Sequence, residues 1–334
     1  MTVAAIRAVA NRHPFAYAWA RMDGSIKVGI IGGSGLGEAL LRQTQGTRHE
    51  VDTPFGRPSD AVMETEWAGL PVFFLSRHGP GHVFGPSQVP FRANVFALKR
   101  LGCTHVIASG AVGSLREEFR PRDLVIPDQV IDKTFRRPGT FFERAAVHVE
   151  LSEPFCPVLR RTIVDVATEG QGDGHKTHTR GCYVCMEGPA FSTRAESLMH
   201  RLWGGDLIGM TAMPEAKLAR EAEMSYALVA LVTDYDCWRR PPAAAVESGG
   251  GKAEGPAEQD PYVLLQEIIA NLQAASDNAI GLIRRTIERV SQRRDELAAA
   301  PAREALKLAI WSDKSRIPPE EVERLGPLWM KYFE

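Results

Sequence analysis

The chain has 334 residues, which is enough for one large domain or two. Hydrophobic residues make up 44% and charged residues 24%, a composition typical of soluble globular proteins that excludes a wholly disordered chain. The formal net charge of −1 argues against nucleic acid as the main partner, although it allows a small basic pocket for an anion.

The expected strands and helices alternate along the chain. Short apolar runs predict strands at 28–31, 71–75, 105–108, 124–126, 181–186 and 228–232. Helical patterns lie near 92–101, 154–169, 193–203, 214–223 and 262–299. Most of the strands are continuous apolar runs, which is typical of a sheet covered on both faces. The alternation predicts an α/β fold with a mostly parallel or mixed β-sheet.

The two ends and one internal tract differ from this pattern. Residues 1–25 are rich in Ala and Arg, as in a targeting peptide, but a secretory apolar region is missing. We interpret them as an N-terminal extension, with translation from Met22 as a further reading. Residues 26–299 form the expected single domain, interrupted by a Gly/Pro-rich insertion at 239–260. Residues 300–334 are expected to be a C-terminal helical extension.

No apolar run is long enough to cross a bilayer, which argues against an integral membrane protein and against a membrane partner. Five scattered cysteines are too few for a disulfide scaffold and indicate a reducing compartment, so we expect a cytoplasmic protein. Cys182 and Cys185 have C-x-x-C spacing but lie in a predicted strand, where a redox pair is not expected. The histidines show no metal-binding spacing, and no metal is expected.

The first predicted strand ends in a glycine-rich loop, residues 32–37, that contains Ser34. Glycines after a strand let backbone N–H groups approach an anion, and the serine hydroxyl adds a donor. A dinucleotide-binding loop is the rival reading, but the final glycine of that motif and the acidic residue after a second strand are missing. By itself this loop predicts a plain turn and a phosphate site equally.

Two further polar segments follow predicted strands. Arg77 and His78 come after the run 71–75, and arginine suits bidentate anion contacts while histidine can donate beside it. Residues 109–114, which include Ser109 and Gly110, form a second small, donor-rich turn after the strand at 105–108. Because strand ends share one edge of an α/β sheet, the three segments together predict an anion pocket.

Three later segments offer groups for a polar, planar ligand. Phe191 and Ser192 follow another strand, and the Phe191 ring could stack on a planar ligand, although a core aromatic is the commoner outcome. Met210 and Thr211 lead into a helix. Asp234 and Asp236 end the strand at 228–232, where two acids at i and i+2 point to one side. A solvated turn is the alternative there.

Many ordered segments carry a resemblance to a known family. They are residues 30–36, 52–60, 77–79, 94, 97–99, 102–107, 113–118, 153–157, 187–189, 210–211 and 234–238. Together they resemble the nucleoside phosphorylase family, specifically its trimeric branch, from about residue 27 to 238 and again in the helix after the Gly/Pro-rich tract. The resemblance implies an α/β nucleoside-phosphorylase-like fold, with a mixed central β-sheet flanked by helices. It also implies phosphorolysis, in which phosphate attacks C1′ of a purine nucleoside. Inorganic phosphate is then a co-substrate, and no other cofactor is implied.

The resemblance also implies roles for individual residues. It assigns the phosphate cradle to Ser34, Arg77, His78, Ser109 and Thr211. It makes Met210 the ribose neighbour and Phe191 the base-stacking ring. Asp234 is implied to be the acid that hydrogen-bonds purine N7 and N6, with Asp236 supporting the same edge. Gly110 and Ser109 stand where the family often has alanine and threonine, and the hydroxyl is kept.

Two positions imply the class of base. Relatives that act on inosine and guanosine place an asparagine where this chain has Asp234 and a glutamate where it has Ser192. A carboxylate accepts from a 6-amino group, whereas a 6-oxo group repels it. An unpaired buried polar group costs about 1–3 kcal/mol, so 6-aminopurines are favoured. The expected reaction is the phosphorolysis of 5′-methylthioadenosine to adenine and 5-methylthio-ribose 1-phosphate, in purine and methionine salvage.

The 5′ pocket is implied less directly. His148 matches a family histidine that approaches the site of the neighbouring subunit, which implies a homotrimer. The apolar lining is expected from the start of the long helix, at Leu264, Leu265, Ile268 and Ile269. Because the tract 239–260 is longer than in the family, other purine nucleosides such as adenosine, deoxyadenosine or methylthioinosine are alternative substrates. A non-catalytic nucleotide- or anion-binding relative is the alternative of another class, and a dinucleotide oxidoreductase is a more distant one.

Overall fold

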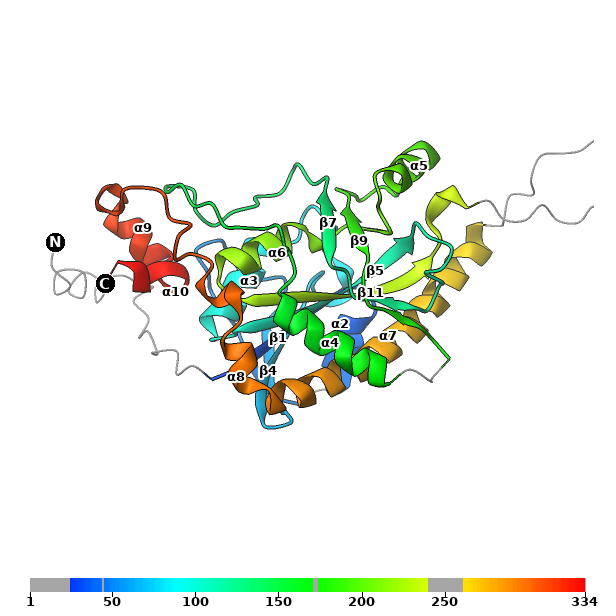
Figure 1. Ribbon diagram of the computed structural model, residues 1–334, viewed down its shortest axis with the longest axis horizontal. Helices are drawn as coiled ribbons and strands as arrows, with labels where there is room; N and C mark the ends of the chain where they lie inside the picture. Colours follow the sequence, from blue (N-terminus) through cyan, green and yellow to red (C-terminus); the bar gives the residue numbers. More distant parts are fainter. Residues whose placement is uncertain (1–24, 44, 171–173, 240–260, 334) are drawn as a thin grey trace, which may run out of the picture.

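A mixed sheet of eleven strands forms the centre of the described part of the chain, with helices on both faces (Figure 1). This is a computed structural model, and it describes residues 25–43, 45–170, 174–239 and 261–333. Apart from Ser25 and Arg239, the predicted N-terminal extension and the predicted insertion at 239–260 lie outside these residues. The observed architecture confirms the predicted α/β class with a mixed sheet flanked by helices.

The central strands are parallel neighbours and are almost completely buried. The strand β1 pairs in parallel with β4 and β5, and β5 pairs in parallel with β11. The sheet order is β2-β3-β4-β1-β5-β10-β9-β7, with β11 joining β5 to β6 and β6 joining β8. The bounds are β1 Val28–Gly32, β2 Thr47–His49, β3 Val62–Trp67, β4 Leu70–Ser76, β5 His105–Ser114, β6 Leu124–Val125, β7 Gln129–Asp132, β8 Thr177–His178, β9 Cys182–Cys185, β10 Leu207–Gly209 and β11 Ser225–Asp234.

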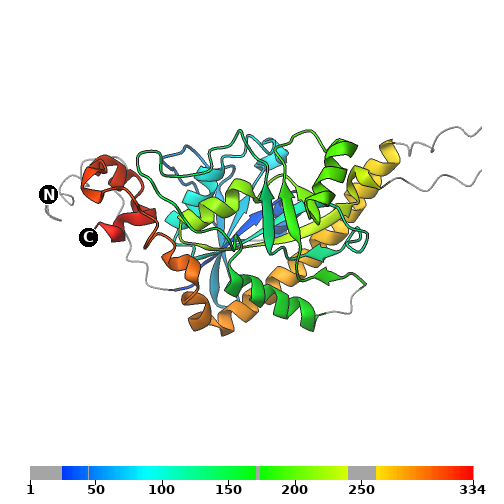
Figure 2. The ribbon, with the colours of Figure 1, turned by 45° about the horizontal axis from the view of Figure 1, so that its top comes forward.

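The helices cover the sheet in two layers (Figures 1 and 2). The helices α3 and α6 pack on one face, and α2, α4 and α7 pack on the other, each layer sharing one apolar core with the sheet. Buried strands therefore alternate between two cores, which explains their continuous apolar runs. The bounds are α2 Leu36–Gln43, α3 Phe91–Arg100, α4 Pro157–Glu169, α5 Arg194–Leu202, α6 Ala212–Glu221, α7 Pro261–Gln292, α8 Arg294–Ala298, α9 Pro319–Arg324 and α10 Gly326–Trp329.

The C-terminal segment packs into the same core as α3 and α6 from Leu306 onward, whereas Ala300 and Ala302 pack into the other core. Leu306, Leu325 and Trp329 are completely buried there. The carboxylate of Glu223, two residues after α6, accepts hydrogen bonds from the Leu306 N–H and from the Tyr332 hydroxyl. Buried aromatic and aliphatic side chains of this size contribute roughly 1.5–3 kcal/mol each. The short helices α9 and α10 thus close one end of the fold (Figure 1).

One local expectation was wrong. The predicted turn at 109–114 is the second half of β5, which continues to Ser114. The reason is pairing: β11 accompanies β5 from Ser225↔His105 through Val232↔Val112, and β10 pairs with its last residues. Small residues in this stretch do not end the strand because both of its neighbours satisfy its backbone groups. In the described residues, no helix is long and apolar enough to cross a membrane.

Candidate active site

The ends of β1, β4 and the middle of β5 meet at one edge of the sheet and bring the predicted anion-binding segments together. The Gly33 N–H donates to the Ser109 hydroxyl at 3.3 Å, and the Arg77 N–H donates to the Gly32 carbonyl at 2.9 Å. Ser34 follows Gly33 and is half-buried. Strand ends at one edge are where α/β proteins bind ligands. The expectation that these three segments are neighbours is confirmed.

Gly33 allows this close approach. A Cβ atom at Gly33 would lie 2.7 Å from Arg77 Nη1 and 2.7 Å from the Ser109 carbonyl oxygen. Backbone and a fully buried guanidinium cannot move aside, so any side chain at this position would push the loop away from β5. A glycine is therefore required at position 33 because the loop packs directly against Arg77 and β5.

Arg77 is completely buried and bonds to a carboxylate of its own chain. Its Nε and Nη2 each donate to Glu215 at 2.9 Å, and its Nη1 donates to the Ser109 carbonyl at 2.6 Å. The Tyr226 hydroxyl donates to the same carboxylate at 2.8 Å. Burial acts to lower the pKa of Arg77, but the Glu215 carboxylate outweighs it and the pKa is raised. Arg77 thus makes its bidentate contact with Glu215 and not with a ligand. Two of its five N–H groups remain to donate to an anion.

His78 lies beside Arg77 with its proton placement fixed by a carbonyl. Its Nδ1 is 2.8 Å from the Phe84 carbonyl oxygen, which can only accept, so Nδ1 carries the hydrogen. The ring stacks on His82 with centroids 4.1 Å apart. Burial and the charge of Arg77 lower the pKa of His78 to about 4. Near neutral pH its Nε2 is therefore an acceptor, suited to a protonated phosphate oxygen, and not the donor that the sequence suggested.

Thr211 and Met210 lie at the start of α6, beside the anion-binding segments. Thr211 precedes the first residue of α6, is 8% exposed, and its side chain makes no capping bond. Its hydroxyl lies 3.5 Å from the position that a Cβ would take at Gly110. A Cβ at Gly188 would come within 2.6 Å of Met210 Sδ, so Met210 lies against the segment after β9. Ser109, Gly110, Arg77 and Thr211 are thereby brought together.

The two acids lie at the end of β11, where a bulge follows Val232. Asp234 Oδ2 accepts from the Thr233 hydroxyl at 2.7 Å, and Oδ1 accepts from the Asp236 N–H at 2.7 Å. Asp236 has a φ of +49° and a buried Oδ2 without a hydrogen-bond partner among the described residues. A Cβ at Gly113 would be 3.2 Å from Asp234 Oδ1, so this glycine makes room for the acids. Asp234 and Asp236 thus lie together beside Gly113, but Asp236 belongs to the 3₁₀ helix Asp236–Trp238 and not to the strand whose alternation predicted their common direction.

Burial raises the pKa of both acids. For Asp234, burial is the main cause, opposed by the hydrogen bonds from Thr233 and the Asp236 N–H and reinforced by the charge of Asp236. For Asp236, burial is again the main cause. A carboxyl group whose pKa is raised holds a proton more readily and can donate it to a ligand.

Phe191 and Ser192 lie on the segment between β9 and α5. The Phe191 side chain is 85% exposed, so it is not a core aromatic. The Ser192 hydroxyl points to Met186 Sδ at 3.8 Å, and its carbonyl accepts from Cys237 Sγ at 3.2 Å. The segment therefore runs beside the residues that follow Asp236, and an exposed ring here is free to stack on a ligand.

The start of α7 approaches the same edge from the other layer. The Asn271 amide donates to the Thr233 carbonyl at 3.0 Å, and Leu272 is 3.2 Å from the position of a Cβ at Gly35. Ile268 lies one turn earlier on the same helical face as Leu272. Leu265 and Ile269 are 53% and 57% exposed. The side chain of Leu264 lies outside the described residues.

His148 is not brought to this site within one chain. It is exposed, its N–H donates to the Ala309 carbonyl, and its ring lies 4.6 Å from that of Trp311. Trp311 is itself 72% exposed, and Leu308 nearby in the chain is 87% exposed. His148 therefore belongs to a separate surface formed with the C-terminal segment.

Sequence reasoning missed three charged residues that order the site: Glu215, Arg137 and Glu187. Glu215 pairs with Arg77 across 138 positions, and Arg137 pairs with Glu187 across 50. No local spacing reveals such pairs. The sequence could have indicated them only through charge balance, because an arginine that is buried after a strand requires a buried acidic partner.

In the described residues, no three His, Cys, Asp or Glu side chains are grouped closely enough to hold a metal ion. Cys182 and Cys185 are both free thiols, and burial raises the pKa of each, to about 11 for Cys182 and about 12 for Cys185. Such thiols are weak nucleophiles near neutral pH, which agrees with the expectation of no redox pair.

Comparison with known proteins gives a consistent picture. Residues 27–288 match the family model described as the phosphorylase superfamily. S-methyl-5′-thioadenosine phosphorylase of Synechocystis sp. is 44% identical over 313 residues, which is 92% of this chain and 87% of that protein. A crystal structure of methylthioadenosine phosphorylase from an antarctic soil metagenomic library is 39% identical, covers 92% of this chain and 99% of its own, and has a TM-score of 0.78. Methylthioadenosine phosphorylase from Schistosoma mansoni in complex with adenine is 32% identical, with 86% and 99% coverage and a TM-score of 0.73.

Proposed function

The chain belongs to the phosphorylase superfamily, and we propose that it is a pentosyltransferase that cleaves S-methyl-5′-thioadenosine with phosphate. The products are adenine and 5-methylthio-ribose 1-phosphate. One observation carries the proposal: β5 bears both ends of the site. Ser109 and Gly110 face the anion loops, and Gly113, four residues from Ser109, faces Asp234. At about 3.3 Å per residue the two ends are about 13 Å apart, which gives room for a phosphate, a pentose and a base in line.

The phosphate is held by donors on one side and by an acceptor on another. The hydroxyls of Ser34, Ser109 and Thr211 and the remaining N–H groups of Arg77 donate to its oxygens. His78 Nε2 accepts from the protonated oxygen of HPO₄²⁻. Because Glu215 neutralises Arg77, the pocket binds the dianion mainly through directed hydrogen bonds, which are stronger where donor or acceptor is charged.

Bond cleavage requires that the base leave with an electron pair. A phosphate oxygen forms a bond to C1′ as the C1′–N9 bond breaks, and the pair passes into the purine ring. Asp234, whose pKa burial raises, donates its proton to N7 and accepts from the 6-amino group. Asp236 holds the same edge. Phe191 stacks on the ring, Ser192 and Gly110 line the pocket, and Met210 contacts the ribose.

The 5′ methylthio group lies against the apolar face of α7 that contains Leu265 and Ile268. We further propose a homotrimer in which the surface around His148 approaches the site of the neighbouring subunit. The exposure of Trp311 and Leu308 beside His148 supports a contact surface there. Light scattering after size exclusion at several protein concentrations tests the trimer. The reaction needs no metal or organic cofactor, and we propose a cytoplasmic location and a role in purine and methionine salvage.

The proposal is tested by base release from four nucleosides. Purified protein is incubated with phosphate and, separately, with methylthioadenosine, adenosine, methylthioinosine or inosine. We expect the fastest release, as adenine, from methylthioadenosine and none without phosphate. Faster cleavage of inosine or methylthioinosine would overturn the role of Asp234 in base selection. No release from any of the four would favour a non-catalytic binding protein.

A further inference from the structure

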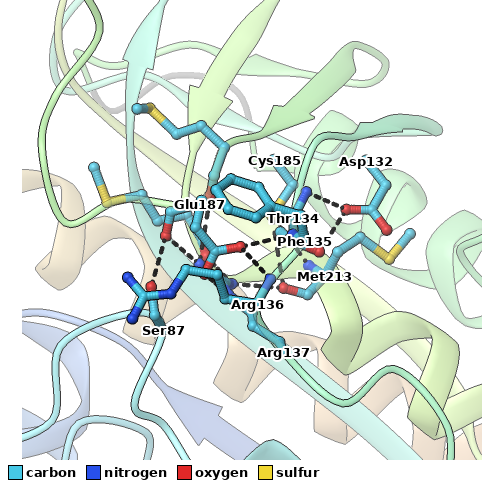
Figure 3. Close-up of polar contacts among 11 residues, drawn as sticks. Ser87, Asp132, Thr134, Phe135, Arg136, Arg137, Cys185, Glu187 and Met213 are labelled. Atoms are coloured by element: carbon cyan, nitrogen blue, oxygen red, sulfur yellow. Dashed lines mark hydrogen bonds and ion pairs between the residues drawn. The ribbon is translucent and has the colours of Figure 1, made fainter.

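The loop that follows β7 places Arg137 in the interior beside the site (Figure 3). The side chain is 1% exposed. Its Nη1 donates to the carbonyl oxygens of Met210 at 2.5 Å and Met213 at 2.8 Å. Its Nη2 donates to the Glu187 carbonyl and to the Met186 carbonyl, and its Nε donates to the Glu187 carboxylate at 3.1 Å. All five N–H groups of the guanidinium are thus directed at acceptors.

Glu187 balances this charge and ties the loop to β9. Its side chain is 7% exposed, and its Oε2 accepts from the N–H groups of Phe135 at 2.8 Å and Arg136 at 3.2 Å. Burial acts to raise the pKa of Glu187, but these hydrogen bonds and that from Arg137 hold it at about 2. The pair is therefore ionised and adds no net charge beside the phosphate pocket. Any effect of Arg137 on the reaction must come from geometry.

The segment that Arg137 holds is the one that bears Met210 and Thr211. The two carbonyl contacts are at its ends, Met210 and Met213. Met213 has φ −115° and ψ 138°, so the regular hydrogen bonds of α6 do not fix the segment. Besides Arg137, Met213 is held by Cys185 Sγ, a weak hydrogen-bond partner that lies 3.3 Å from its N–H and 3.7 Å from its carbonyl oxygen. The Thr211 N–H also lies 3.4 Å from the Tyr183 hydroxyl, so the guanidinium and Tyr183 together set the orientation of the Thr211 hydroxyl.

We propose that Arg137 is a positioning residue for phosphorolysis: by holding the carbonyls of Met210 and Met213 it aims Thr211 at phosphate and Met210 at the ribose. The proposal rests on the proposed function. A lysine cannot replace the arginine, because an ammonium group is a point donor and cannot span carbonyls on two sides. A displacement of about 1 Å at reacting groups can cost about 100-fold in rate.

The test compares Arg137→Lys and Arg137→Met with a matched control, Arg160→Met. Arg160 on α4 also donates to three carbonyl oxygens, those of Ile126, Pro127 and Thr179, and it lies away from the site. Steady-state rates are measured with phosphate and methylthioadenosine varied separately, together with thermal unfolding of each protein. We expect kcat/KM for phosphate to fall about 100-fold in R137M and about 10-fold in R137K. Arg160→Met should lower the unfolding temperature and leave kcat/KM unchanged.

Several outcomes overturn the proposal. If both Arg137 variants are less stable but keep kcat and both KM values, the arginine only holds the fold together. If Arg160→Met loses as much kcat/KM as Arg137→Met, the loss reflects general destabilisation. Should Arg137→Met not fold, Arg137→Lys and Glu187→Gln carry the test, and normal kinetics in both would contradict the proposal. Failure of the proposed function is separate, because it would appear as no phosphate-dependent adenine release by the unaltered protein.

Discussion

The proposed phosphate side and the proposed base side of the site are built differently. On the phosphate side, Arg77 and Glu215 are completely buried and Ser109 nearly so, and each has several partners within the chain. On the base side, Phe191 is 85% exposed, and the buried Oδ2 of Asp236 has no partner among the described residues. The same sheet edge therefore combines a buried, densely hydrogen-bonded cluster with groups that have fewer partners within the chain.

The difference matches what each half would bind under the proposed function. A phosphate dianion needs donors fixed in advance, because reorganising charged groups during the reaction is costly. A flat base needs a ring that can close on it and a carboxyl group kept partly neutral by burial. We therefore expect substitutions on the phosphate side to lower stability and activity together, and substitutions on the base side to lower activity alone.

The largest expected effect is from Glu215→Ala. The change leaves the Arg77 guanidinium and the Tyr226 hydroxyl buried without their shared acceptor. Breaking a buried ion pair in this way costs about 3–5 kcal/mol, to be measured as the free energy of unfolding in urea at fixed protein concentration. Glu150→Ala is the control, since its carboxylate is 64% exposed and pairs with Arg220, and we expect a loss below about 1 kcal/mol. Equal losses of unfolding free energy in the two variants would show that the buried Arg77–Glu215 pair contributes no more to stability than an exposed pair.

Asp234→Asn should change the reaction and not the fold. The amide keeps the shape but cannot donate the proton to N7, so we expect adenine release from methylthioadenosine to fall about 100-fold. Cleavage of inosine should rise relative to that of adenosine, because the amide can donate to a 6-oxo group. The unfolding temperature should be unchanged or slightly higher, because burial disfavours the charged form of Asp234 and the amide carries no charge. Full adenosine activity without a shift toward inosine would contradict the assignment.

Glu221→Gln should make stability less dependent on pH. Burial raises the pKa of Glu221 to about 7, although the Phe141 N–H donates to it. The folded state thus binds this proton more tightly than the unfolded state, and the wild type loses stability as pH rises from about 4.5 to about 7. By linkage this amounts to about 3 kcal/mol, which glutamine avoids. The variant should gain in unfolding temperature over the wild type between pH 5 and pH 8, and a constant difference would argue against the raised pKa.

The smallest expected effect is from Phe191→Ala. Stacking of a base on an aromatic ring contributes about 1–3 kcal/mol, so KM for methylthioadenosine should rise about 10-fold while KM for phosphate stays constant. Because the ring is exposed, the free energy of unfolding should change by less than about 0.5 kcal/mol. Leu202→Ala, which removes another exposed side chain, should alter neither quantity. A stability loss above 1 kcal/mol in Phe191→Ala would place the ring in the core instead.

Much of this arrangement could be predicted from the sequence where short-range patterns carry it. Continuous apolar runs identified the central strands, and the residues that follow them identified the anion segments and the two acids. The longer extent of β5 could not be predicted, because Ser109 to Ser114 are strand residues only by pairing with β11 and β10. The partners of Arg77 and the role of Arg137 also depend on contacts across many residues. The hydrogen-bond direction of His78 needed the position of the Phe84 carbonyl.

Transfer of a pentose to phosphate distinguishes the proposed reaction from simple hydrolysis of the nucleoside. The most direct measurement is ³¹P NMR of the reaction with methylthioadenosine and inorganic phosphate, together with the amount of adenine released. We predict one sugar phosphate ester for each adenine and no adenine when phosphate is omitted. Adenine formed without phosphate, or with no phosphate ester, would show hydrolysis and contradict the account.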